Sequence, residues 1–199
     1  MEEPAPGKPH PFLLAIVVEG GIGLIAVGAG SLLGTPPAEQ LRWTPQAGLV
    51  GLLATIPLVC FAWLLMRVRL RPFEAMLRLL DEVVVPLFRQ CPIWQLGVIS
   101  LFAGLGEEML FRGVLQQALT PSIGEPWDAT IGLLAASVLF GLLHWLTTAY
   151  AVLATLIGVY LGGLWMLTGN LLIPAVVHAL YDFWALVYLV RLRRSGAGP

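Results

Sequence analysis

Charged residues are scarce in this sequence. They make up 12% of its 199 residues, whereas soluble domains carry about 25%. The formal net charge is −1, which gives no electrostatic basis for binding nucleic acid. Hydrophobic residues reach 58%, so a folded chain could not cover its surface with polar groups. Lipid is therefore expected to be the solvent for much of the protein.

Cysteine is scarce as well. The chain has two, Cys60 within an apolar run and Cys91 beside Pro92, and this spacing excludes a disulfide framework or a cysteine metal site. An HExxH sequence, the usual zinc-protease helix, is absent. No cleavable signal peptide is expected, because the first apolar run is too long for the hydrophobic core of one. We expect that run to be retained as a span.

The sequence instead contains long apolar runs. Six runs are each near the roughly 20 residues that cross about 30 Å of hydrocarbon, namely 12–34, 47–66, 93–119, 129–147, 149–168 and 171–190. Residues 73–90 instead alternate apolar and charged positions at helical spacing, which predicts an amphipathic helix on the membrane surface. The expected fold is all-α: a single integral membrane domain over 1–199, with six transmembrane helices, one surface helix, and tails at 1–11 and 192–199.

Arginine placement predicts the orientation. Cytoplasmic loops of membrane proteins are enriched in Lys and Arg. Arginines cluster in the connection after the second span and behind the sixth span, and an even number of spans separates these two regions. Both ends of the chain are therefore expected in the cytoplasm, in a prokaryotic inner membrane. The arginines concerned are Arg67, Arg69, Arg71, Arg78, Arg89, Arg191, Arg193 and Arg194.

Ionisable residues within the predicted spans indicate function. A charge near mid-bilayer costs about 2.5–3.5 kcal/mol on insertion scales, so such residues are expected to pair, to line a wet cavity or to do chemistry. Glu19, among glycines of the first span, could simply bond to a neighbouring helix. The full set is Glu19, Glu107, Glu108, Arg112, His144, His178 and Asp182.

Helical spacing sorts these residues into pairs. Glu108 and Arg112 are four apart and can form an ion pair on one helix face. Glu107 is turned by about 100° from Glu108 and is left without that partner, which makes it a candidate general base. His178 and Asp182 are again four apart, so that the carboxylate could orient the imidazole.

Three short motifs carry a resemblance to a known family. Residues 107–112 have the form EExxxR, residues 140–144 the form FxxxH, and residues 178–182 the form Hxxx(N/D). Their order, each on an apolar span within about 93–190, resembles the CAAX prenyl protease and bacteriocin-processing family, also called the CPBP or Abi family. Prenyl-protease members typically end the third motif in Asn, and this chain has Asp182.

The resemblance implies a glutamate-dependent intramembrane endopeptidase that acts on a peptide or protein substrate, including substrates associated with the membrane. Glu107 and His144 would activate water, and His178 and Asp182 would stabilise the oxyanion. An ionised carboxylate cannot donate a hydrogen bond, so Asp182 would stay protonated or would orient a protonated His178. The residues implied as supports are Glu108, Arg112 and Phe140.

Two alternatives stay open at this point. Glu107, His144 and His178 could bind zinc with water as the fourth ligand, as in a metalloendopeptidase, although the resemblance favours a reaction without a metal or other cofactor. The same side chains could instead serve a non-catalytic membrane partner, an immunity protein or a small proton-coupled transporter. Possible helix breaks at Pro57 and Pro174 are the feature that hints at transport.

Overall fold

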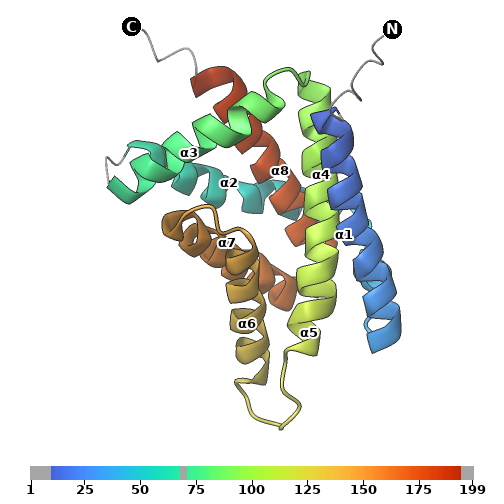
Figure 1. Cartoon of the computed structure of the whole chain (residues 1–199). Coiled ribbons are helices and arrows are strands. Elements are labelled where there is room, and N and C mark those ends of the chain that lie inside the picture. The colour runs from blue at the N-terminus through green and yellow to red at the C-terminus, as the bar shows by residue number, and fades with distance from the viewer. Residues whose placement is uncertain (1–9, 68–70, 194–199) are drawn as a thin grey trace, which may run out of the picture.

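Helices account for all regular structure in the part of the chain that the computed structural model describes, residues 10–67 and 71–193 (Figure 1). The predicted tails lie mostly outside this part, as do Arg69 and Arg194. The helices are α1 (Pro11–Leu33), η1 (Pro37–Gln40), α2 (Pro45–Arg67), α3 (Arg71–Phe88), α4 (Ile93–Leu110), η2 (Phe111–Leu115), α5 (Gln116–Ala118), α6 (Asp128–Leu143), α7 (Thr148–Thr168), α8 (Leu172–Val187) and η3 (Tyr188–Leu192).

All six predicted apolar runs form helices at the expected places. Among the described residues, four helical segments are long and apolar enough to cross a membrane: α1, α2, α7, and α8 together with η3. The fourth expected span forms α6, a shorter apolar helix of 16 residues. The third runs through α4, η2 and α5 and carries two glutamates. The predicted fold class, a polytopic helical membrane bundle, is therefore confirmed.

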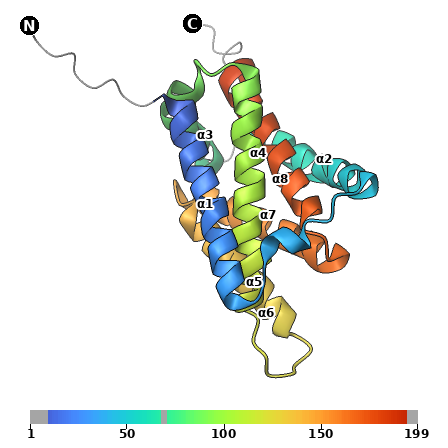
Figure 2. The ribbon, with the colours of Figure 1, turned by 90° about the vertical axis from the view of Figure 1, so that its right-hand side faces the viewer.

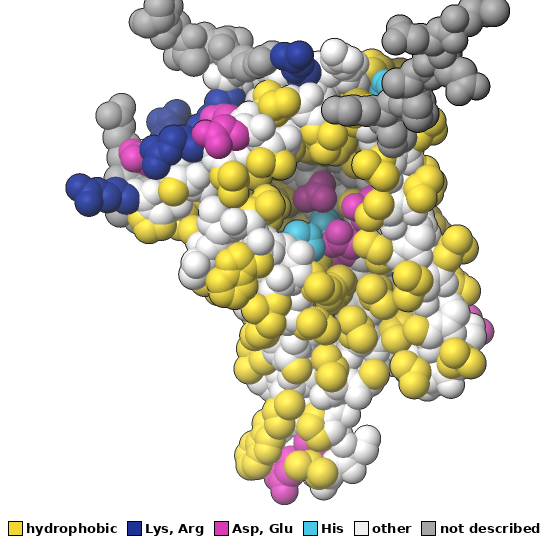
Figure 3. Space-filling view, in the orientation of Figure 1, with side chains coloured by type: hydrophobic (Ala, Val, Ile, Leu, Met, Phe, Trp, Pro, Cys, Tyr) yellow, Lys and Arg dark blue, Asp and Glu magenta, His cyan; other side chains and the backbone are white. Residues whose placement is uncertain are grey.

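The amphipathic surface helix is confirmed as α3. Its apolar residues Met76, Leu80 and Val85 are buried against Leu153 of α7 and Leu189 of η3. Lys and Arg side chains gather along this edge of the molecule, over α3 (Figure 3). The helix thus covers one end of the bundle with its apolar side inward. α1 begins and η3 ends at this same end (Figures 1 and 2).

Two local features differ from the sequence prediction. The third span contains a π-helical turn, η2, at residues 111–115; such turns are frequent at functional sites. The fourth span ends at Leu143 rather than at 147, so His144 caps the helix instead of lying within it. The physical reason is local capping: Thr147 accepts a hydrogen bond from the backbone N–H of Tyr150 and starts α7.

The expected helix breaks are absent at both prolines. Pro57 lies inside the continuous helix α2, and Pro174 lies in the first turn of α8, where its missing N–H costs no helical hydrogen bond. Neither proline divides a span into unwound halves, so the hint of a transporter from these positions is removed.

Glycines bring α4 close to its neighbours. α1 and α4 run side by side, and α8 packs on the other side of α4 (Figures 1 and 2). A Cβ at Gly104 would lie 2.6 Å from the backbone nitrogen of Ala179 in α8, and a Cβ at Gly106 would lie 2.6 Å from the carbonyl oxygen of Glu19 in α1. The helix backbones therefore nearly touch, which places the following Glu107 in the middle of the bundle.

Gly104→Val should destabilise the protein by about 1–3 kcal/mol, because the new side chain meets backbone rather than a movable side chain. Gly21→Val is the matched control, since a Cβ at Gly21 meets nothing within 4 Å. Thermal unfolding in detergent measures both variants. Equal melting temperatures for the two would contradict the close approach of α4 and α8.

Candidate active site

Glu107 is the buried acid at the centre of the site. Its Oε2 lies 3.6 Å from Nε2 of His144 and 3.9 Å from Nε2 of His178. Both separations exceed a direct hydrogen bond of 2.7–3.2 Å, and Oε2 has no hydrogen-bond partner among the described residues. The structure therefore brings together one acid and two histidines from α4, the end of α6 and α8, with their polar atoms facing a common point.

Glu108 forms the ion pair that the sequence predicted. Its Oε1 lies 3.2 Å from Nη1 of Arg112, and the two side chains are 0% and 1% exposed. The guanidinium also donates to the carbonyl oxygen of Gly158, at 2.9 Å from Nη2. A Cβ at Gly158 would lie 3.4 Å from that same nitrogen. The glycine thus lets α7 approach Arg112, in keeping with the small-residue packing expected between membrane helices.

His178 contacts the predicted carboxylate, Asp182, and a second one that was not predicted, Glu108. Nδ1 of His178 lies 2.9 Å from Oε1 of Glu108, and Asp182 is found on the other ring nitrogen, 3.4 Å from Nε2. Glu108 and Asp182 therefore hold the ring from its two sides, and the tight contact of α4 with α8 brings the Glu108 carboxylate to Nδ1. Both ring nitrogens face carboxylates, an arrangement in which an imidazolium donates on both sides.

His144 is held by its own helix end. Nδ1 lies 2.8 Å from the carbonyl oxygen of Phe140. A carbonyl can only accept, so Nδ1 carries the hydrogen and the neutral ring keeps a lone pair on Nε2. That lone pair faces Glu107. The structure therefore presents His144 as a proton acceptor beside a second proton acceptor.

The Phe140 ring packs against His144, His178 and Arg112. It is buried, with ring centroids 4.3 Å from His144 and 5.9 Å from His178. The Arg112 guanidinium carbon lies 4.9 Å from its centroid, and Phe111 packs edge-on at 4.9 Å. One aromatic side chain thus packs against both imidazoles and the guanidinium, in keeping with a supporting role.

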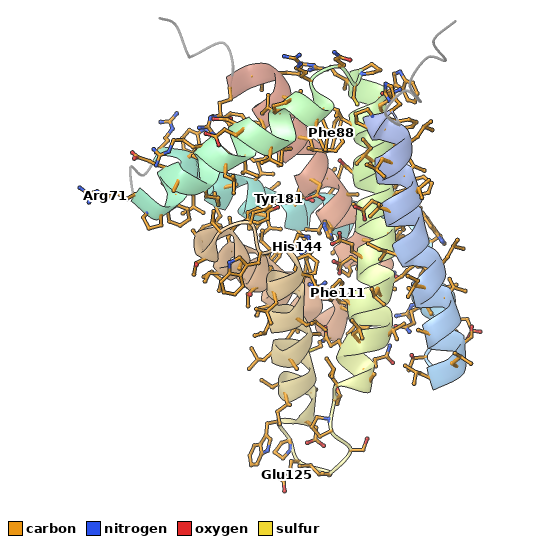
Figure 4. All side chains as sticks on the ribbon, viewed as in Figure 1. Arg71, Phe88, Phe111, Glu125, His144 and Tyr181 are labelled. Atoms are coloured by element: carbon orange, nitrogen blue, oxygen red, sulfur yellow. The ribbon has the colours of Figure 1, made fainter. Side chains whose placement is uncertain are left out.

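A cavity of about 210 Å³ opens onto His144, His178 and Asp182. Its other walls are largely apolar and come from α2, α3, α7, α8 and η3. Figure 3 shows the hollow with acidic and histidine side chains at its floor and yellow apolar side chains around it. His144 and Tyr181 lie beneath α3 in this region, while Arg71 and Glu125 lie at distant edges of the molecule (Figure 4).

Three further residues belong to these surroundings. Tyr150 and Tyr181 line the cavity, and no short motif marked them; tyrosines near span ends are ordinarily interfacial anchors. Glu19 lies on α1, which packs against α4, and its Oε2 is buried without a hydrogen-bond partner in the described part of the chain. In the sequence, the isolated charge of Glu19 within an apolar run was the feature that could have marked it as part of the site.

The side chains considered as zinc ligands make other polar contacts in this structure. Within residues 10–67 and 71–193, no group of three or more His, Cys, Asp or Glu side chains is arranged to hold one. His178 has its Nδ1 bonded to Glu108, and its Nε2 is shared between Glu107 and Asp182. These contacts belong to an ionic hydrogen-bond network.

Comparison with known proteins gives a family for the segment that holds this site. Residues 89–184 match the family model described as type II CAAX prenyl endopeptidase Rce1-like. The chain is also similar to an uncharacterized protein of Bacillus subtilis (strain 168), YpbD, with 36% identity over 90 residues. That match covers 42% of this chain and spans 40% of the length of YpbD. No solved structure matches. All three motifs lie within the matched segment, so the part of the chain that carries the site is similar to the Rce1-like family of type II CAAX prenyl endopeptidases.

Proposed function

We propose that this chain is an intramembrane endopeptidase that hydrolyses a peptide bond with water held by Glu107 and His144. One observation carries the proposal. Two proton acceptors, Oε2 of Glu107 and Nε2 of His144, lie 3.6 Å apart without a hydrogen bond between them. A water beside both atoms can donate one hydrogen to each, which is the geometry that a general base requires.

The reaction follows from these contacts. Glu107 takes a proton from the water while the water oxygen bonds to the carbonyl carbon of the scissile peptide. The oxyanion that forms accepts a hydrogen bond from Nε2 of a protonated His178, which Glu108 holds in place. The carbon–nitrogen bond then breaks and the amine leaves with the proton, delivered by Glu107 or His144. Water is consumed, with its hydroxyl on the new carboxyl group and its hydrogen on the amine.

The substrate in this proposal is a peptide that reaches the site from the membrane, of the CAAX-like or another membrane-associated kind. Apolar side chains of α3, α7 and η3 wall the cavity above the histidines. Such walls favour a substrate whose reacting peptide is joined to an apolar group, because burial of that group from water or headgroups is favourable.

Purified full-length protein in lipid nanodiscs provides the test. The probes are a farnesylated CAAX peptide with a quenched fluorophore and the same peptide without the lipid. Cleavage is expected, and it should survive exhaustive chelation. Activity that chelation abolishes and zinc restores would contradict the metal-free proposal. Failure of both probes, together with failure of a broad pool of membrane-associated peptides, would contradict peptidase activity itself.

Asp182→Asn tests how Asp182 acts. In the geometry above, Asp182 accepts from a charged His178 at 3.4 Å, and an amide holds an imidazolium less well than a carboxylate does. Turnover should therefore fall by about 10–100-fold, the effect typical of losing an orienting partner. Steady-state cleavage of the farnesylated probe measures it. Retention of full activity would show that the position supplies a donor instead.

The proposed orientation places α3 and both ends of the chain in the cytoplasm. α3 and Glu125 lie at opposite ends of the molecule (Figure 4). Single cysteines at Glu82 and at Glu125, in a chain with Cys60 and Cys91 replaced by serine, should react with impermeant thiol reagents from opposite sides of the membrane. Labelling of position 82 from outside intact cells would show that the orientation is the opposite of the proposed one.

A further inference from the structure

The proposed reaction lacks one hydrogen-bond donor. Oxyanion sites usually present two or more donors to the developing charge. Glu107 and an ionised Asp182 can only accept, and Nδ1 of His144 is committed to the Phe140 carbonyl. His178 therefore contributes a single donor, Nε2, which it also directs toward Asp182. A tyrosine hydroxyl, a donor at neutral pH because its ordinary pKa is about 10, would complete the site.

Tyr150 is placed to supply that donor. It lies in the first turn of α7, which Thr147 caps, six residues after His144. Its ring centroid is 6.4 Å from that of His144, and its side chain lines the cavity. The ring packs on the apolar cluster around Met76 and Leu189, which fixes its direction.

The Tyr150 hydroxyl is uncommitted among the described residues. No hydrogen bond to it is found there, whereas the hydroxyl of Tyr160 in the same helix donates to the carbonyl oxygen of Ala54 at 2.7 Å. A phenol inside an apolar wall normally finds a partner. A cavity-lining hydroxyl without one is therefore available to a ligand.

Position favours Tyr150 over the other cavity tyrosine. The ring of Tyr150 lies beside that of His144, one of the two groups proposed to hold the water. The ring of Tyr181 instead packs with Leu58 and Val177, on the side of α2.

We propose that Tyr150 is a catalytic residue whose hydroxyl donates a hydrogen bond to the carbonyl oxygen of the scissile bond and to the oxyanion that replaces it. No proton is transferred; the phenol stays protonated throughout. This assignment rests on the proposed peptidase function. It adds a donor outside the three motifs, which makes the position of α7 against α6 part of the catalytic geometry.

Tyr150→Phe tests the proposal in the full-length protein, because it removes the hydroxyl and keeps the packed ring. With the farnesylated probe or any peptide that the wild type cleaves, kcat should fall by about 10²–10³, with KM changed little. The melting temperature should stay at the wild-type value. Tyr160→Phe is the matched control: it removes a bonded hydroxyl outside the site and should leave kcat unchanged.

The outcomes separate this inference from the proposed function. Wild-type kcat in Tyr150→Phe, or the same loss in Tyr181→Phe with none in Tyr150→Phe, overturns the role of Tyr150 while the peptidase stands. A Tyr150→Phe loss confined to KM, or matched by a lower melting temperature, also overturns it, since that pattern belongs to binding or packing. A wild-type protein that cleaves no peptide in the pool removes the peptidase and this inference together.

Discussion

The double variant Glu107→Gln/His144→Gln should lose little more activity than either single variant. If both side chains hold one water, removal of either one disables the same step. Each single variant is expected to lose about 10²–10⁴ in turnover, the usual contribution of general acid–base catalysis. The turnover of the double variant should lie within about tenfold of that of the less active single variant, because the effects of residues that act as a unit are not additive.

Cleavage of one verified peptide by the purified variants measures these losses, with melting temperatures to confirm the fold. Glu125→Gln is the matched control, since the same change falls in the connection between α5 and α6, away from the cavity (Figure 4). Losses that multiply in the double variant would mean that Glu107 and His144 act in separate steps. Such a result would contradict the proposal that the two side chains hold one shared water.

Arg112→Ala should cause the largest loss of stability. The substitution leaves the Glu108 carboxylate at 0% exposure without its cation, and breaking a buried pair in this way costs about 3–5 kcal/mol. The variant should therefore express poorly and melt at a much lower temperature. Glu107→Gln should melt near the wild type, because Oε2 of Glu107 has no hydrogen bond in the described structure to lose.

Arg193→Ala is the control for the ion pair. Arg193 and Asp81 lie 3.1 Å apart but are 28% and 42% exposed, and such a pair contributes about 0–1 kcal/mol. Thermal unfolding in detergent compares the two arginine variants. Equal melting of Arg112→Ala and the wild type would show that Glu108 does not depend on Arg112, and that His178 alone holds it.

Periodicity explains how much of the fold the sequence predicted. Runs of about 20 apolar residues leave a single solution in lipid, and the charged face of residues 73–90 separates α3 from the spans. The π turn at 111–115 and the early end of α6 left no such pattern. A capping contact at Thr147 starts the next helix just after α6, and the π turn lies where Gly113 comes close to Pro37, far away in the chain.

The candidate site divides in the same way. Spacing within one helix predicted that Glu108 pairs with Arg112, which the structure confirms at 3.2 Å. Spacing also predicted that Asp182 contacts His178, and the two lie 3.4 Å apart, but it did not predict the contact of Glu108 with His178, because Glu108 approaches from another helix. Tyr150 and Glu19 join the surroundings of the site through packing between helices. No intrahelical rule describes such packing.

The most direct test of the account is a single turnover of the purified, metal-depleted protein in water enriched in heavy oxygen, alongside Glu107→Gln. Direct attack by a water on Glu107 and His144 predicts that the first product carries heavy oxygen in its new carboxyl group. The Glu107→Gln protein should bind the same peptide and release no product. A first product without the label, or cleavage by Glu107→Gln at the wild-type rate, would contradict the account.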